Sequence, residues 1–442
     1  MQTFLHQVKA ASLATMFIFA CFSATQAETL QEAVQYMLGS NPDILTLRHN
    51  RLARDQEVKQ ARSGYFPELN LGAGAGKNEV YEPFDDTLSP YELTLGLRQN
   101  VFAGLSTKNE VARQEARVRS QAYLLQATSE NFTLRAAEVY FQVLRHKELL
   151  ALAEENLLIH QRIADQIELR SESGISRKSD IDQARSRLLL AESNLILAET
   201  NLLDAETNYQ AVIGHMPHML TMPESFDDLL PASQEIASHQ AIKAHPQLKS
   251  AKADLEARHA QNEVAKSPFM PIIDLEVDRI WTDDYGYTYD NRDNLIGMVR
   301  LRYNFFKGWN DTARKAETLE LINEAREIRN HTQRQVVESI RLSWMAYQAA
   351  IKRIEYQKLR VTATQNTAAA YTEQWNIGSR TLLDVLDSEA ERIDAQQDYV
   401  NAIYDRHYSQ YRILNGMGTL VHALHLEWPK ESFVDEEEDT DN

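Results

Sequence analysis

The stretch YELTLGLRQNVFAGL, residues 91–105, decides how this chain folds. Its first eight residues alternate between apolar side chains and polar or small ones, which predicts a β-strand with one apolar face. The strand runs into the turn Asn100-Val-Phe-Ala-Gly104, and neither glycine nor proline occurs in residues 105–173. As a helix, this segment would be about 100 Å long at about 1.5 Å per residue. Such a length predicts a coiled-coil-like rod rather than a globular domain.

The same arrangement occurs again 204 residues further along the chain. Residues 295–309, LIGMVRLRYNFFKGW, repeat the strand and the turn, and residues 309–377 again lack glycine and proline. Five turn residues recur at this offset: Pro42, Pro67, Gly174, Asp180 and Gly214 return as Pro246, Pro271, Gly378, Asp384 and Gly418. Internal repetition of this kind predicts two tandem structural units.

The predicted units share one plan. Each has a helix, a β-hairpin, a long helix and a returning helix. The bounds we predict are 28–214 for the first unit, with its hairpin at 67–102, and 241–418 for the second, with its hairpin at 271–306. A connector, 215–240, joins the units, and residues 419–442 form a C-terminal acidic tail.

Both hairpins have one apolar and one polar face, with aromatic residues near their ends. The polar face of the second hairpin carries five charged residues: Asp274, Glu276, Asp278, Arg300 and Arg302. Strands of this length and alternation are typical of transmembrane β-barrels, and a charged inner face suits a water-filled lumen. A soluble hairpin packed on a core is the alternative that periodicity leaves open. A bilayer admits only closed barrels, and four strands are too few to close, so the membrane interpretation requires an oligomer.

The composition restricts the class of protein. The chain has 46 basic and 64 acidic residues, a formal charge of −18 and a mean hydropathy of −0.46. No apolar run of about 18 residues occurs outside residues 1–27, which excludes a polytopic helical membrane protein. The negative charge argues against a nucleic-acid partner. No HExxH, GxSxG or Cys/His nucleophile pattern is present, so we expect no enzyme, no cofactor and no metal site.

Residues 1–27 are predicted to be a signal peptide. They contain Lys9 as the only formal charge, an apolar stretch over residues 10–22 and the small-residue exit Thr25-Gln-Ala27. The exported chain would then start at Glu28. The only cysteine, Cys21, lies inside this segment, and cleavage before it with lipidation is the alternative interpretation.

Two hairpins that each run into a very long helix at Asn-x-Phe-x-Gly resemble the TolC family of outer-membrane channel-tunnel proteins. The sequence WNIGSRTLLDVLD, residues 375–387, resembles the family's tunnel tip. The resemblance covers about residues 28–420. It implies an α+β membrane protein, a homotrimer with a 12-stranded β-barrel, four strands from each chain, continuous with a helical coiled-coil barrel. It also implies a place in the outer membrane of a Gram-negative cell, most of the mass in the periplasm, and docking to an inner-membrane translocase through a periplasmic adaptor.

The resemblance also assigns a periplasmic gate. It implies that Asp384 and Asp387 form rings of carboxylates in a trimer, which attract cations. Arg380 and Trp375 resemble the residues that hold the tip closed, and Asp180 is their expected partner. Helix capping is the alternative role, because Ser179-x-x-Asp182 and Thr381-x-x-Asp384 both match helix-start boxes.

The sequence therefore predicts an exit duct for type I secretion of a protein such as an adhesin or toxin, driven by an ABC transporter. The alternative within this architecture is the duct of a multidrug or metal efflux pump, which a proton-driven transporter could serve. A periplasmic coiled-coil adaptor or structural rod is a different class, and it would have no need for four amphipathic strands.

Overall fold

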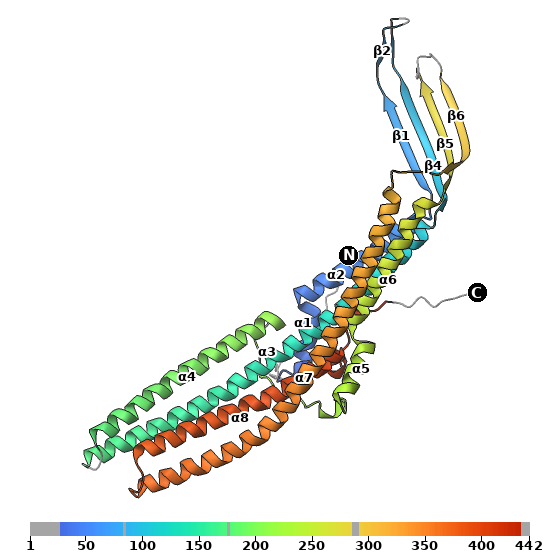
Figure 1. Ribbon diagram of the computed structural model, residues 1–442. Helices are drawn as coiled ribbons and strands as arrows, with labels where there is room; N and C mark the ends of the chain where they lie inside the picture. The colour runs from blue at the N-terminus through green and yellow to red at the C-terminus, as the bar shows by residue number, and fades with distance from the viewer. Residues whose placement is uncertain (1–26, 83–84, 175–176, 285–290, 435–442) are drawn as a thin grey trace, which may run out of the picture.

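The computed structural model describes residues 27–82, 85–174, 177–284 and 291–434. Most of the predicted signal peptide and the end of the acidic tail lie outside these residues. The molecule is elongated, with a β-sheet at one end, a rod of helices next to it, and two antiparallel helix pairs at the other end (Figure 1). Within the described residues, no helix is both long and apolar enough to cross a membrane.

The sheet has four antiparallel strands in the order β1-β4-β5-β6. Their bounds are β1 Glu68–Ala75, β4 Tyr91–Ala103, β5 Ile272–Asp283 and β6 Arg292–Arg302. A second small hairpin, β2 Asn78–Val80 with β3 Asp86–Leu88, extends the first one beyond the sheet. The second hairpin ends at Arg302, four residues before the predicted bound at 306.

The pairing register places the two kinds of side chain on opposite faces of the sheet. Asp274, Glu276 and Asp278 in β5 pair with Asn100, Arg98 and Gly96 in β4. The other face is mostly apolar, apart from the ion pair of Arg279 with Asp293, and its leucines are exposed in the single chain, for example Leu71 at 73% and Leu295 at 73%. This is the alternation that the sequence predicts.

Six helices of the described chain build the rod and its extension. The long helices are α3 Ser106–Glu172 and α7 Asn310–Asn376, each of 67 residues. The shorter α2 Pro42–Ser63 packs on α3, and α6 Pro246–Lys266 packs on both long helices in the half nearest the sheet. The returning helices α4 Lys178–Ile213 and α8 Leu382–Met417 pack along the far halves of α3 and α7.

The turn between sheet and rod depends on backbone with positive φ. Gly104 has φ +60° and Leu105, the residue before α3, has φ +65°. A β-carbon at Gly104 would lie 2.5 Å from the carbonyl oxygen of Ser267, which begins the short 3₁₀ helix Ser267–Phe269. Only glycine fits here, because a side chain would collide with that backbone.

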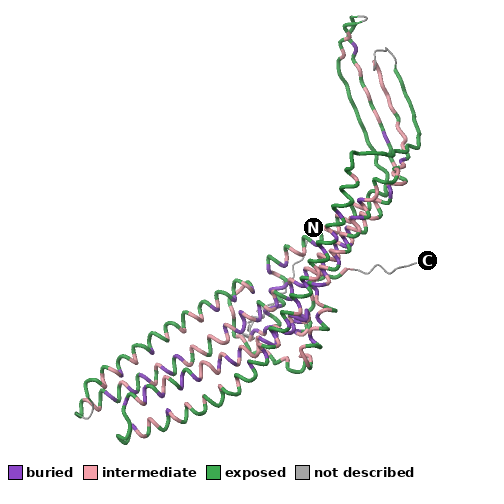
Figure 2. The backbone as a smooth tube through the Cα atoms, viewed as in Figure 1, coloured by how far each residue is buried: buried purple, intermediate pink, exposed green. Residues whose placement is uncertain are grey.

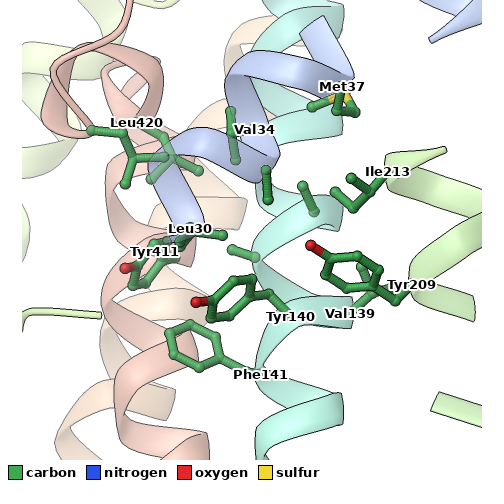
Figure 3. Close-up of a cluster of buried hydrophobic side chains, with 14 of the residues drawn as sticks. Leu30, Val34, Met37, Val139, Tyr140, Phe141, Tyr209, Ile213, Tyr411 and Leu420 are labelled. Atoms are coloured by element: carbon green, nitrogen blue, oxygen red, sulfur yellow. The ribbon is translucent and has the colours of Figure 1, made fainter. Parts of the chain in front are cut away.

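A layer of short segments surrounds the middle of the long helices, and we call it the collar. Its elements are α1 Leu30–Ser40, α5 Gln234–Ala244, α9 Leu420–Ala423, the 3₁₀ helices Asp227–Leu229 and Lys430–Ser432, and the connector between α4 and α5. The largest buried cluster of the described chain lies here, where Tyr140, Tyr209 and Tyr411 meet α1 (Figure 3). Buried residues gather at this level, while both ends of the molecule are mostly exposed (Figure 2).

One carboxylate fastens the connector to the long helices. Asp227 accepts hydrogen bonds from Tyr347 in α7 at 2.7 Å, from Gln410 in α8 at 2.6 Å and from Arg406 at 2.5 Å. Burial tends to raise the pKa of Asp227, but hydrogen bonds from Ser225, Tyr347 and Arg406 outweigh it and lower the pKa to about 2. Asp227 is therefore charged at neutral pH.

We expect Asp227→Asn to lower the thermal midpoint by a few degrees at pH 7. The folded-state pKa is depressed, so its contribution is present above about pH 4, the unfolded value, and is lost as the pH falls toward about 2. Thermal scans by circular dichroism should therefore show a difference from the wild type at pH 7 that disappears near pH 2. A constant difference over this range would exclude ionisation of Asp227 as the cause.

Candidate functional site

The candidate site is the tip, where both helix pairs turn at the end far from the sheet. Gly174 and Gly378 both have positive φ at these turns, at +73° and +77°. A buried cluster joins the two pairs just behind the turns. Its members come from α3, α4, α7 and α8: Ile163, Ile167, Ala184, Trp375, Leu382, Val385 and Leu386.

Trp375 is a packing residue of this cluster. Its side chain is only 6% exposed, and the Arg170 guanidinium of α3 lies over its ring, 3.9 Å from the centroid. Arg170 also donates to the Asn376 side chain at 3.4 Å. The stacked cation links α3 to α7, so the aromatic position joins the two helix pairs through packing and a cation–π contact.

Arg380 binds within its own helix pair. Its guanidinium lies 4.1 Å from the Tyr371 ring centroid, donates to Gln374 at 3.0 Å and is 3.9 Å from an Asp384 oxygen. The predicted contact with Asp180 is not among the contacts of the described residues of one chain. The turn at Gly378 explains this, because it folds Arg380 back over the last turn of α7.

Asp180 and Asp384 both cap the start of a returning helix. Asp384 accepts from the backbone N–H of Thr381 at 3.1 Å and from its hydroxyl at 2.8 Å. These hydrogen bonds lower the pKa of Asp384. Asp180 accepts from the Arg177 backbone N–H at 3.2 Å. The Thr381 box is therefore confirmed, but the Ser179 box is wrong, because α4 starts at Lys178 and Asp180 takes the third helical position.

Asp387 carries a link that sequence reasoning missed. Arg187 of α4 donates to Asp387 of α8 at 2.7 Å, which ties the two returning helices together. The Asp387 side chain is still 54% exposed, so it remains accessible to ions. Arg187 lies next to the apolar Leu188 of α4, and coiled coils place interhelical ion pairs beside their apolar positions. This pattern is the sequence signal that could have identified the pair.

The polar face of the sheet holds a charge network near the rod. The Asp274 side chain is fully buried and accepts from Arg98 at 3.1 Å and Asn100 at 2.9 Å, and it also pairs with Arg302. Glu276 accepts from Arg300 at 2.7 Å and lies 3.5 Å from Arg302.

Asp278, the third acid of this face, packs over the β4 backbone. A β-carbon at Gly96 would lie 2.6 Å from its carboxylate. The structure thus gathers the five predicted charged residues on one face. It adds Arg98 and Asn100, whose position is explained by the strand pairing.

Comparisons with known proteins agree with this architecture. A family model described as outer membrane efflux protein matches residues 33–215 and again residues 237–419. The outer membrane efflux protein BepC of Brucella suis is 26% identical over 403 residues, covering 90% of this chain and 87% of that protein. The outer membrane protein TolC of Escherichia coli is 24% identical over 414 residues, covering 90% and 84%. The solved structure of VceC from Vibrio cholerae superposes with a TM-score of 0.76 at 18% identity, covering 90% and 97% of the two chains.

Proposed function

The chain belongs to the outer membrane efflux protein family, and from this premise we propose that three copies form an exit duct for type I secretion of a protein. It is an outer-membrane channel of the kind that serves tripartite transport systems, with a large helical part in the periplasm. The observation that carries the proposal is the four-stranded sheet with one apolar and one charged face, continuous with a helical rod.

The sheet supports a trimeric barrel. Among the described strands, β1 and β6 each have one edge without a partner in this chain. A bilayer leaves no backbone group unpaired, so these edges require a neighbour there. Three copies joined edge to edge would give twelve strands, with the leucine face toward lipid and the Asp274 network toward water.

The tip supports the role of a gate. Each chain contributes a helix pair α3/α4 and a pair α7/α8, and the contacts of Arg170 and Arg187 hold these pairs together. Separating the pairs would widen the mouth. The gate consists of this link together with Arg380, Trp375, Asp180, Asp384 and Asp387. We propose that the chain catalyses no reaction itself and requires a periplasmic adaptor and an inner-membrane transporter for energy.

Efflux of small molecules is the second candidate, favoured by the name of the BepC relative. The two functions are separated by a deletion strain that carries the chain on a plasmid. If the chain serves secretion, we expect the plasmid to restore a large secreted protein to the medium and to leave the drug and metal susceptibility of the strain unchanged. Restored resistance without a change in secreted protein would contradict the secretion proposal and favour efflux.

The carboxylate rings predict block by cations. In a trimer, Asp384 and Asp387 would place six carboxylates at the mouth, and such rings bind multivalent cations. The double variant Asp384→Ala, Asp387→Ala is expected to lose block by trivalent cations in planar bilayers. Asp398→Ala is the matched control, because Asp398 also lies on α8 and forms an ion pair, with Arg360 at 2.6 Å, but it stands 11 residues beyond Asp387, away from the turn. Persistent block in the double variant would exclude the ring assignment.

A further inference from the structure

Glu28 is held by the collar through its main chain. Its backbone N–H donates to the Met219 carbonyl at 2.8 Å. Its own carbonyl accepts from the Tyr140 hydroxyl of α3 at 2.8 Å and from the Thr221 backbone N–H at 3.2 Å. A residue that precedes the first helix is thereby fixed to the centre of the longest helix and to the connector.

The Glu28 side chain is held as well. Its carboxylate accepts from the Tyr209 hydroxyl of α4 at 2.8 Å and from the His218 backbone N–H at 3.3 Å. The His215 ring nitrogen Nε2 lies 3.4 Å from the same carboxylate. The Glu28 residue is 9% exposed and Tyr209 is fully buried. These partners hold both the main chain and the side chain of Glu28 in place. Residues at the start of a chain are usually poorly ordered unless such contacts fix them.

Glu28 is also the residue at which the sequence predicts that the exported chain starts. Cleavage after Ala27 would turn the Glu28 amide nitrogen into a primary ammonium. Glu28 also lines an open cavity of about 390 Å³ together with Glu32, Tyr36, His215 and His218, and the Glu32 carboxylate accepts from the Thr29 backbone N–H at 2.8 Å. Two carboxylates and the Met219 carbonyl suit a cation that has three protons to donate.

We propose that this is a docking site for the new N-terminus, which it recognises as a primary ammonium on a glutamate, and that its occupation completes the collar. Removal of the signal peptide is then a step of assembly as well as of export. The uncleaved chain has an uncharged amide in place of this ammonium.

The position of this site also argues against the alternative interpretation in which Cys21 is lipidated. Glu28 binds Tyr140, which lies 34 residues along α3 from Ser106 at the base of the sheet, about 50 Å of helix. The seven residues from Cys21 to Glu28 span at most about 25 Å when fully extended. A lipid on Cys21 would therefore not reach the membrane around the sheet while Glu28 occupies this site.

The first test uses the trimer purified from outer membranes. Its intact mass should correspond to a chain that starts at Glu28 with an unmodified amine. At about pH 6.5 an acylating reagent prefers the α-amine to lysine, whose pKa is higher. We expect this amine to react at least about tenfold more slowly in the trimer than in the unfolded chain. A chain that starts elsewhere, a lipid-modified Cys21, or equal rates in both states would overturn the proposal.

The second test compares two buried tyrosines of the collar. Tyr209→Phe removes the hydroxyl that holds Glu28 and should raise the labelling rate of the α-amine several-fold in the trimer. Tyr411→Phe is the control, because the buried Tyr411 hydroxyl has no hydrogen-bond partner within the described chain. If Tyr209→Phe yields no trimer, Glu28→Ala supplies the same test, since it removes the carboxylate that the Tyr209 hydroxyl holds and leaves the α-amine free to react. If the α-amine is labelled at the same rate in these variants as in the Tyr411→Phe control, the proposed docking site is wrong.

Discussion

Replacing Arg187 with glutamate is expected to open the tip and to raise the single-channel conductance several-fold. Arg187 of α4 holds Asp387 of α8 at 2.7 Å, so the substitution exchanges an attraction between the two helix pairs for a repulsion. Attraction or repulsion in a partly exposed pair amounts to about 0.2–1 kcal/mol, and a change of about 1.4 kcal/mol shifts a closed-to-open ratio tenfold, so the exchange should shift this ratio several-fold. Adding Arg170→Ser, which removes the cation over Trp375, should increase the open fraction further.

Planar bilayer recordings of the assembled protein measure this effect. Arg360→Glu is the matched control, because Arg360 pairs with Asp398 inside the α7/α8 pair and not between the pairs. Arg380→Ser is expected to raise conductance less than Arg187→Glu, since among the described residues the ring contact, hydrogen bond and ion pair of Arg380 are with Tyr371, Gln374 and Asp384 of its own helix pair. Unchanged conductance in an assembled Arg187→Glu trimer would rule out the closed-tip model.

Replacing Glu130 with alanine is expected to release the C-terminal segment from the collar. Glu130, in the middle of α3, is 1% exposed and accepts from the Leu420 backbone N–H at 2.8 Å, the Val421 backbone N–H at 3.3 Å and the Trp428 indole at 2.9 Å. Burial raises the pKa of Glu130 to about 7, although these three donors oppose the rise. The substitution leaves three buried donors without an acceptor, each at about 1–3 kcal/mol.

We expect the thermal midpoint of Glu130→Ala to fall by roughly 5 °C or more, since about 1 kcal/mol shifts a large domain by about 2–4 °C. Limited proteolysis should then cut the chain between α8 and the tail. Glu138→Ala is the control, because Glu138 also lies on α3 but forms its ion pair with nearby Arg135 of the same helix, at 2.7 Å. A midpoint equal to that of the control, with no new cleavage, would show that Glu130 does not hold the segment.

Local periodicity made the strands and helices predictable. The alternation around Leu95 and around Leu275 set the two faces of the sheet, because residues two apart in a strand share a face. The absence of glycine and proline after Gly104 set the length of α3. The small hairpin β2–β3 was missed, because three-residue strands carry too little alternation to be recognised.

Contacts between distant segments were not predictable in the same way. The partner of Asp387 is 200 residues away in the sequence, and its choice depends on how α4 and α8 lie side by side. For the same reason, Asp180 was expected to bind Arg380, although it caps its own helix. No sequence motif marks Glu28 or Glu130. Their partners are mainly backbone groups and tyrosines of other elements, which leave no fixed pattern near either residue in the sequence.

In the proposed barrel, β1 of one copy pairs with β6 of the next, which closes a ring of three chains. The exported chain is predicted to lack cysteine, since Cys21 is the only one and precedes Glu28, so engineered cysteine pairs report cleanly. Cysteines placed along β1 near Leu71 and along β6 near Val299, oxidised in outer membranes, should give covalent dimers and trimers and nothing larger on denaturing gels. A chain that reaches the outer membrane but remains monomeric at every cysteine pair, or forms a ladder beyond three, would contradict the trimeric barrel.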